Sequence, residues 1–178
     1  IIVHLYGNPA NVDKILELKK KFNFKIIEDC AQAHGAEYKG KKVSTFGDIG
    51  TFSFFPSKNL GCFGDGGCVV TNKKKYFLKM KKMANHGGLK KNTHEILGRN
   101  SRLDNIQAGI LRVKLKRLNK WINLRNKQAK LYHRHLSIIN KISLIKRLDK
   151  TKSTFHLMVI RTRKRNSLKK FLENQGIS

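Results

Sequence analysis

Acidic residues are scarce in this sequence, and it has neither a long apolar run nor an even set of cysteines. The 178 residues include only 11 Asp and Glu but 39 Lys and Arg, so the formal net charge is +28. No run of about 18 apolar residues is present, which excludes a membrane-spanning helix. A hydrophobic content of 39% excludes a disordered chain. The three cysteines include no Cys-x-x-Cys pair, which argues against a disulfide framework or a zinc ribbon. We therefore expect reduced cysteines and a cytoplasmic protein.

The first residues do not have the pattern of a signal peptide. The chain starts at Ile1 rather than Met, and the opening IIVHLYG has no basic segment before its apolar residues. The length corresponds to one domain, or to one domain and part of another. We expect that the chain begins partway into a longer protein.

The positive charge has two interpretations. A basic surface is what a phosphate-rich partner such as a nucleic acid requires. The Lys and Arg residues are, however, spread over helical patterns such as KKKYFLKMKKM and LRVKLKRLNKW, where we expect them to form solvated faces. Stacking aromatics do not alternate with them as in a nucleic-acid-binding stripe. A basic nucleic-acid-binding module therefore stays an alternative, and nucleic acid is not the favoured partner.

The N-terminal part has the pattern of a strand, a helix and a second strand. Residues 1–6 form an apolar run before a Gly-Asn-Pro turn, Asn11 is a suitable helix N-cap, and residues 24–27 form a second apolar run that ends at Glu28 and Asp29. Short joints between these segments predict a parallel crossover. Ligands bind at the carboxyl ends of parallel strands, so Asp29 lies where a site residue is expected.

Glycine-rich and helical patterns follow. Residues 47–71 contain six glycines, which allow close approach of the main chain to a ligand, and include predicted strands over 51–55 and 68–71. Periodicity predicts a helix over 73–85 and one long helix, or two joined, over 104–136. The last predicted elements are a strand over 154–161 and a helix over 167–174. We expect three parts: a large α/β domain over 1–103, a connecting helical region over 104–136, and the start of a small domain over 137–178.

Lys58 is the lysine best placed for covalent chemistry. It follows an apolar strand and Pro56 inside the glycine-rich segment and lies apart from the basic helices. Burial there would lower its pKa and favour the free amine, whereas the alternative is an ordinary surface lysine. Imine chemistry suggests pyridoxal phosphate, which needs an acid for its pyridine nitrogen and donors for its phosphate. Asp29 and Ser53 are candidates for these two roles.

Three stretches carry a resemblance to a known family: IIEDCAQAHGAEYKGKKV, FGDIGTFSFFPSKNLGCFGDGGCVVT and GRNSRLDNIQAGIL. They closely resemble the DegT/DnrJ/EryC1/StrS family of pyridoxal-phosphate-dependent nucleotide-sugar aminotransferases, and the resemblance runs from VHLYG to the final NQGIS. It implies an α/β, aspartate aminotransferase-like fold (PLP fold type I) with a mostly parallel sheet, helices on both faces and the start of a small C-terminal α+β domain. It also implies a fragment that lacks the N-terminal segment and most of the C-terminal domain.

The resemblance assigns roles to five residues. Lys58 matches the Schiff-base lysine and proton carrier, and Asp29 the carboxylate that pairs with the pyridine nitrogen of pyridoxal 5'-phosphate. Gln32 matches the side chain that packs on the cofactor ring, and Ser53 the hydroxyl that binds the cofactor phosphate. Asn100 matches a residue that reaches the cofactor of a neighbouring subunit, which implies a homodimer with shared active sites. Each also has an ordinary structural interpretation, such as a helix-start cap for Asn100.

The retained lysine also implies the reaction. Similar sugar dehydratases carry His where Lys58 stands, so the resemblance implies transamination from an amino donor, glutamate, to a nucleotide-linked keto-deoxysugar. The product would be an aminosugar for polysaccharide or secondary-metabolite biosynthesis. His34, His86 and His94 match no metal-ligand spacing, so no metal site is expected. A non-catalytic or degenerate fragment of the same fold is the remaining alternative.

Overall fold

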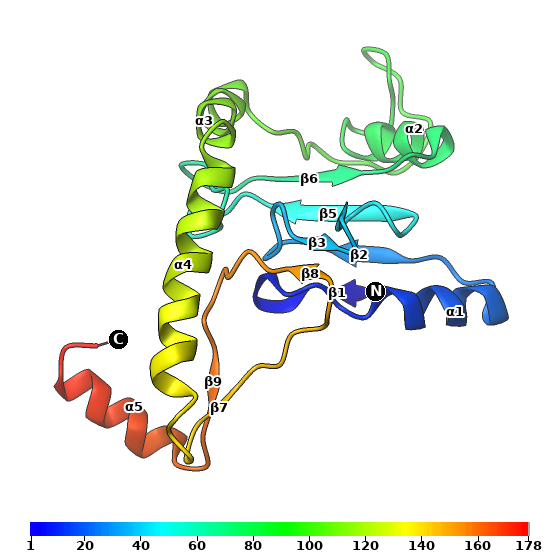
Figure 1. Ribbon diagram of the computed structural model, residues 1–178. Coiled ribbons are helices and arrows are strands. Elements are labelled where there is room, and N and C mark those ends of the chain that lie inside the picture. The colour runs from blue at the N-terminus through cyan, green and yellow to red at the C-terminus, as the bar shows by residue number, and fades with distance from the viewer. Residues whose placement is uncertain (178) are drawn as a thin grey trace.

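A four-stranded sheet forms the centre of the computed structural model, which describes residues 1–177 (Figure 1). The strands β1, β2 and β5 run parallel, and β6 is antiparallel to β5. In spatial order they are β1 (Ile2–Val3), β2 (Ile27–Asp29), β5 (Ile49–Ser53) and β6 (Gly67–Val70). The expected α/β fold with a mostly parallel sheet is confirmed.

Helix α1 (Val12–Phe22) makes the predicted crossover from β1 to β2. The side chain of Asn11 accepts a hydrogen bond from the Lys14 N–H at 3.2 Å, so Asn11 is the expected N-cap. The helix ends where Asn23 adopts a left-handed conformation with a φ of 48°. Three lysines in its last turn lie at the negative end of the helix dipole, which stabilises the helix.

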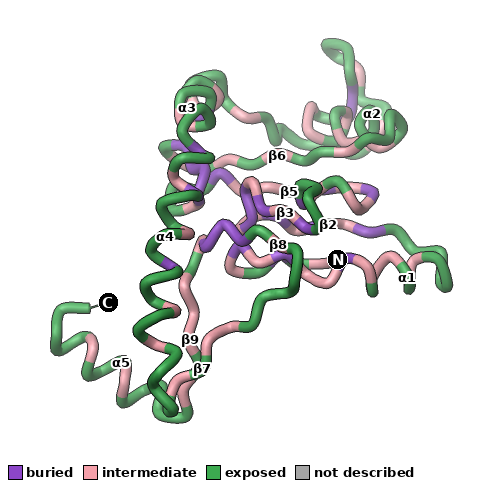
Figure 2. Tube along the Cα trace, viewed as in Figure 1, coloured by how far each residue is buried: buried purple, intermediate pink, exposed green. Residues whose placement is uncertain are grey.

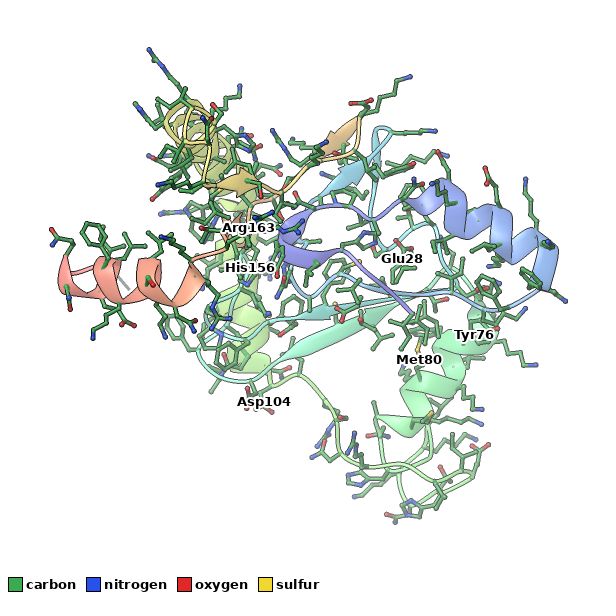
Figure 3. The ribbon with its side chains drawn as sticks, turned by 90° about the horizontal axis from the view of Figure 1, so that it is seen from below. Glu28, Tyr76, Met80, Asp104, His156 and Arg163 are labelled. Atoms are coloured by element: carbon green, nitrogen blue, oxygen red, sulfur yellow. The ribbon has the colours of Figure 1, made fainter. Side chains whose placement is uncertain are left out.

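Four further helices follow in the chain: α2 (Lys74–Met83), α3 (Asn105–Leu115), α4 (Leu118–Leu136) and α5 (Arg165–Asn174). The helical pattern over 104–136 therefore corresponds to two joined helices, one of the two forms expected. In the view of Figure 3, α1 and α2 lie on opposite sides of the sheet. The division of the chain at residues 103 and 136 stays a prediction.

Two predicted strands are shorter than their apolar patterns suggest. After β1 the chain turns through a short 3-10 segment, Leu5–Gly7, in which Tyr6 is left-handed with a φ of 61°. The expected strand over 154–161 is wrong for most of its length, because only β9 (Ile160–Arg161) is extended in a ladder. Residues 154–156 instead form hydrogen bonds to other loops, as described below.

Two smaller sheets bring distant segments together. β3 (Glu37–Tyr38) pairs with β4 (Lys41–Lys42) on one side and with β8 (Thr151–Lys152) on the other. β7 (Ser143–Leu144) pairs with β9. The β3–β8 pair returns the C-terminal part of the chain to the loop that follows β2.

The loops that follow β2 and β5 are part of the buried core (Figure 2). One apolar cluster joins the loop after β5 to the helices α3 and α4, and the other lies within the loop after β2. The first consists of Phe54, Leu60, Cys62, Leu111, Leu118 and Ile122, and the second of Cys30, Ala33, Ala36 and Val43. Phe52 packs against both clusters, so the two loops are fixed relative to each other. Within residues 1–177, every helix is too short or too polar to cross a bilayer.

Candidate active site

Asp29 and Ser53 lie at the carboxyl ends of neighbouring parallel strands. Asp29 ends β2 and is in register with Thr51 of β5, two residues before Ser53. Side chains two residues apart point to the same face of a sheet. The structure therefore places the carboxylate of Asp29 and the hydroxyl of Ser53 on one face, at the edge where ligands bind in parallel sheets.

Lys58 lies in a tight loop immediately after β5. Its N–H donates to the carbonyl of Phe55 at 2.9 Å. A Cβ on Gly61 would lie 2.5 Å from the carbonyl oxygen of Pro56, so the loop requires glycine there. Lys58 is half-buried, and no ion pair among residues 1–177 includes its amine.

Asp29 has one backbone partner and no cation. Its Oδ1 accepts a hydrogen bond from the Ala31 N–H at 2.9 Å. Within residues 1–177 no Lys, Arg or His forms an ion pair with this half-buried carboxylate, although the chain has 28 excess positive charges. Asp29 therefore keeps acceptor capacity for the N–H of a ligand.

Gln32 is held by hydrogen bonds to distant segments, and Ser53 by a local one. The side-chain Oε1 of Gln32 accepts from the Tyr6 N–H at 2.6 Å, and its carbonyl accepts from the Thr154 hydroxyl at 3.4 Å. The hydroxyl oxygen of Ser53 accepts from the Phe55 N–H at 3.3 Å, which leaves the hydroxyl proton to donate elsewhere.

Asn100 lies apart from these four residues. It is exposed, forms an isolated bridge with Asn85, and accepts a hydrogen bond from the Arg102 Nε at 2.9 Å. Helix α3 starts after Asp104, so Asn100 is not its cap. No hydrogen bond in the described part of the chain joins Asn100 to Asp29 or Lys58.

His34 is a buried site neighbour whose environment the sequence did not predict. It is 3% exposed and packs against the rings of Phe52 and Phe54, with centroid distances of 5.3 and 6.0 Å. Neither ring nitrogen has a hydrogen-bond partner among residues 1–177. Burial is the main cause that lowers the pKa of His34 to about 4, and the charges of His156 and Lys58 contribute to the same shift. The only sequence signal for this environment is a histidine among small residues in AQAHGA.

The segment Ser153–His156, which we call the strap, crosses two of the site loops. The Ser153 hydroxyl and the Thr154 N–H both donate to the carbonyl of Gly7, each at 3.0 Å. Asn59, next to Lys58, donates its Nδ2–H to the Thr154 carbonyl at 3.0 Å, and its Oδ1 lies 3.1 Å from the His156 Nδ1. The sequence alone did not indicate this contact.

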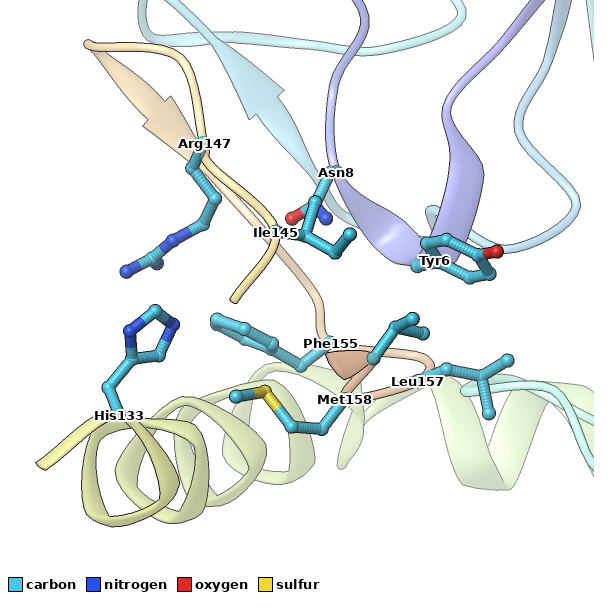
Figure 4. Close-up of a pocket in the computed structure, with 9 residues that line it drawn as sticks. Tyr6, Asn8, His133, Ile145, Arg147, Phe155, Leu157 and Met158 are labelled. Carbon is cyan, nitrogen blue, oxygen red and sulfur yellow. The ribbon is translucent and has the colours of Figure 1, made fainter. Parts of the chain in front are cut away.

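Phe155 lines two cavities. A groove of about 460 Å³ is lined by Asn59, Trp121, Arg125 and Tyr132 together with Phe155. The other cavity, shown in Figure 4, holds about 10 Å³, roughly the space of one water molecule. In the latter, the Arg147 guanidinium lies 5.0 Å from the centre of the Phe155 ring. Asn59 thus lines the groove, which is the larger of these two cavities.

A buried cluster of His4, Glu28 and Cys30 has the composition of a metal site but the contacts of a structural network. Their ligand atoms lie within 4.8 Å of one another. The His4 Nε2 and the Glu28 Oε2 are 3.1 Å apart. The two Glu28 oxygens also accept from the main-chain N–H groups of Ser44 at 2.8 Å, Phe46 at 2.8 Å and Gly47 at 2.6 Å. Burial would raise the pKa of Glu28, but these hydrogen bonds outweigh it and lower the pKa.

Comparisons with known proteins identify relatives over the whole chain. The DegT/DnrJ/EryC1/StrS aminotransferase family matches residues 1–178. The chain is 41% identical over 175 residues to a dTDP-3-amino-3,4,6-trideoxy-alpha-D-glucose transaminase from Streptomyces venezuelae, covering 98% of this chain and 46% of that protein. It is 43% identical over 178 residues to a UDP-N-acetyl-3-dehydro-alpha-D-glucosamine 3-aminotransferase from Acidithiobacillus ferrooxidans, covering 100% of this chain and 48% of that protein.

Solved structures agree with the sequence relatives. The crystal structure of DesV from Streptomyces venezuelae in complex with a ketimine intermediate superposes with a TM-score of 0.95 and 41% identity, covering 99% of this chain and 47% of that one. The structure of 3-amino-5-hydroxybenzoic acid synthase has a TM-score of 0.92 at 27% identity, covering 98% and 48%. The fold is that of the PLP fold type I aminotransferases, and the chain spans about half the length of the relatives it matches.

Proposed function

Because the chain belongs to the DegT/DnrJ/EryC1/StrS aminotransferase family, we propose that the protein transfers an amino group from glutamate to a nucleotide-linked keto-deoxysugar, with pyridoxal 5'-phosphate as cofactor. The names of its relatives, which include transaminases of dTDP- and UDP-linked sugars, support this substrate class. The observation that carries the proposal is the position of Asp29. Its carboxylate is half-buried and has no ion pair among residues 1–177. It is also in register with β5, the strand that leads to Ser53 and Lys58.

The described residues suit this cofactor in their chemistry. Asp29 accepts the N–H of the pyridine ring and keeps that nitrogen protonated, and Ser53 donates its hydroxyl proton to the phosphate. Gln32, fixed by Tyr6 and the strap, would pack against the ring. Pyridoxal phosphate, when bound, supplies an electron sink for the carbon that carries the transferred amine.

Lys58 has two roles in this proposal. Its Nζ holds the cofactor covalently when no amino substrate is bound, which requires the neutral amine as nucleophile. With an amino substrate in place, the same Nζ would take the proton from the substrate carbon as a general base and deliver it, as a general acid, to the cofactor carbon that Lys58 had held. The half-buried position of Lys58 and its lack of an ion pair among residues 1–177 support both roles.

The proposal extends to assembly and location. We propose a homodimer with shared active sites, in which Asn100 reaches the cofactor phosphate of the neighbouring subunit. The exposure of Asn100, and the absence of a hydrogen bond from it to Asp29 or Lys58 within residues 1–177, support this role. We also propose a cytoplasmic protein, with a large domain over 1–103, a helical connection over 104–136 and a small domain from 137 onward.

An amino-transfer assay tests the proposed function. Glutamate added to the pyridoxal-phosphate-loaded protein is expected to yield 2-oxoglutarate and to bleach the visible absorption band. The Lys58→Ala variant is expected to lose about 10³-fold or more of this rate, whereas Lys120→Ala, at an exposed position on α4, keeps it. Equal rates in the wild type and Lys58→Ala would refute the assignment of Lys58, and no 2-oxoglutarate from the wild type would refute the proposed reaction.

A further inference from the structure

We propose that Asn59 is a positioning residue for Lys58 and that His156 holds Asn59 in place. This inference rests on the proposed function, in which Lys58 forms the bond to the cofactor. Asn59 is the next residue in the chain and is only 7% exposed. Both ends of its side-chain amide contact the strap, because Nδ2 donates to the Thr154 carbonyl at 3.0 Å and Oδ1 lies 3.1 Å from the His156 Nδ1.

These contacts define the protonation of His156. The Thr154 carbonyl can only accept, so the amide nitrogen of Asn59 faces it and the amide oxygen faces His156. The His156 Nδ1 therefore carries a proton and donates it to Asn59. Burial lowers the pKa of His156, and the charges of Lys58 and Arg125 lower it further. The ring is thus neutral near pH 7, in the tautomer with the proton on Nδ1.

The strap that contacts Asn59 is itself held in place by hydrogen bonds. Its first two residues bond to the Gly7 carbonyl. Arg125 of α4 donates from Nη1 to the carbonyls of Phe155 at 3.0 Å and His156 at 3.3 Å. The Thr154 hydroxyl also donates to the Gln32 carbonyl. One segment therefore fixes the Lys58 loop relative to Gln32, in the loop that follows Asp29.

The local loop does not supply this positioning by itself. The main chain of Lys58 has one turn hydrogen bond, to Phe55, and its Nζ has no ion-pair partner within residues 1–177. Without the Asn59 amide, the turn can rotate the Cα–Cβ direction of Lys58 away from the face of Asp29 and Ser53. Covalent chemistry is sensitive to displacements of about 1 Å in such a group.

The test compares cofactor binding in Asn59→Ala with that in a matched control. Asn126 of α4 donates its Nδ2–H to the strap at the Ser153 carbonyl, at 3.0 Å, without touching the Lys58 loop. Asn126→Ala thus removes a similar hydrogen bond from the other end of the strap. The measured quantities are the dissociation constant of pyridoxal phosphate from the visible band, the induced circular dichroism of that band, and the thermal unfolding midpoint.

We expect Asn59→Ala to weaken pyridoxal phosphate binding about 10-fold, the effect of one buried hydrogen bond, and to reduce the induced circular dichroism. Asn126→Ala is expected to lower the unfolding midpoint while leaving both cofactor signals unchanged. His156→Ala should reproduce the effect of Asn59→Ala. His156→Gln should restore part of the cofactor signal because it keeps an N–H donor. In the double variant Asn59→Ala/His156→Ala, the loss of cofactor affinity should be less than the sum of the two single losses.

The outcomes separate this inference from the proposed function. If the wild type binds the cofactor at Lys58 and Asn59→Ala matches it in dissociation constant and dichroism, the inference is overturned and the proposed function stands. It is also overturned if Asn126→Ala changes the cofactor signals as much as Asn59→Ala does. If the wild type does not bind the cofactor at Lys58, both fail. If Asn59→Ala does not fold, His156→Ala and His156→Gln are compared by the dissociation constant and the induced dichroism. Equal signals in these two variants and in the wild type then overturn the inference.

Discussion

His4 Nε2 and Glu28 Oε2 lie 3.1 Å apart, and both side chains are fully buried. The contact joins the residue after β1 to the middle of β2, directly before Asp29. Glu28 also holds the loop 44–47 through three main-chain N–H groups. A buried hydrogen-bonded pair thus supports the strand end that presents Asp29.

Replacing Glu28 by Gln should destabilise the fold. The amide nitrogen of the new side chain would face N–H donors, which leaves buried groups without partners at a cost of about 2–3 kcal/mol. Urea unfolding measures the loss, and Glu17→Gln, at an exposed position on α1, should change the free energy of unfolding by less than about 0.5 kcal/mol. Equal stabilities of the two variants would contradict this account of Glu28.

Asp48 should contribute more stability than an exposed acid with a similar partner. Its side chain is 1% exposed and pairs with Lys19 at 2.7 Å and with Lys73. Burial would raise the pKa of Asp48, but the hydrogen bonds from Lys19, Lys73 and the Ile26 N–H hold it well below its usual range. Asp48→Asn is expected to cost about 2–3 kcal/mol in urea unfolding.

The matched control for Asp48 is Asp13, whose side chain is 43% exposed and pairs with Lys39. Asp13→Asn should lower the free energy of unfolding much less than Asp48→Asn does, because solvent screens exposed pairs. Since the folded pKa of Asp48 is lowered, its contribution is present above the unfolded pKa of 3.8 and is lost as the pH falls below it. A larger effect at Asp13 than at Asp48 would contradict the burial argument.

His34 should make folding stability depend on pH between about 6.5 and 4. The folded pKa is about 4 and the ordinary value is 6.5, so the unfolded chain takes up a proton over this range before the folded chain does. Stability is therefore present above pH 6.5 and falls as the pH drops, by about 3 kcal/mol in total. Chemical unfolding at a series of pH values should show a smaller decrease for His34→Leu. Identical pH profiles would refute the neutral, buried state of His34.

Two glycine substitutions should have opposite effects. A Cβ at Gly61 would meet the Pro56 and Phe55 carbonyls at 2.5 and 2.7 Å, whereas a Cβ at Gly109 in α3 meets nothing within 4 Å. We expect Gly61→Ala to cost about 1–3 kcal/mol through forced backbone shifts and to weaken cofactor binding by moving Lys58. Gly109→Ala should stabilise the protein by about 0.5–1 kcal/mol. The thermal unfolding midpoints of both variants test this prediction. A higher midpoint for Gly61→Ala would show that the loop is not close-packed.

The sequence predicted the residues that local rules determine. Asn11 could be identified as a helix cap because side-chain capping is local, and Asp29 as a strand-end residue because crossover connections place strand ends at one edge. The Asn59–His156 contact could not be predicted, because it joins residues 97 apart in the chain. The strand expected over 154–161 was wrong for a related reason. The apolar pattern is real, but the hydrogen bonds of residues 154–156 join them to Gly7, Gln32, Asn59 and Arg125 rather than to a strand.

The most direct test of the account is the identity of the residue that captures the cofactor. Pyridoxal phosphate is added to the purified protein, the bond is reduced with borohydride, and the labelled peptide is mapped beside Lys58→Ala. The account predicts one labelled residue, Lys58, and loss of both the label and the visible band in the variant. Label spread over many of the other lysines, or a visible band of equal intensity in Lys58→Ala, would contradict it.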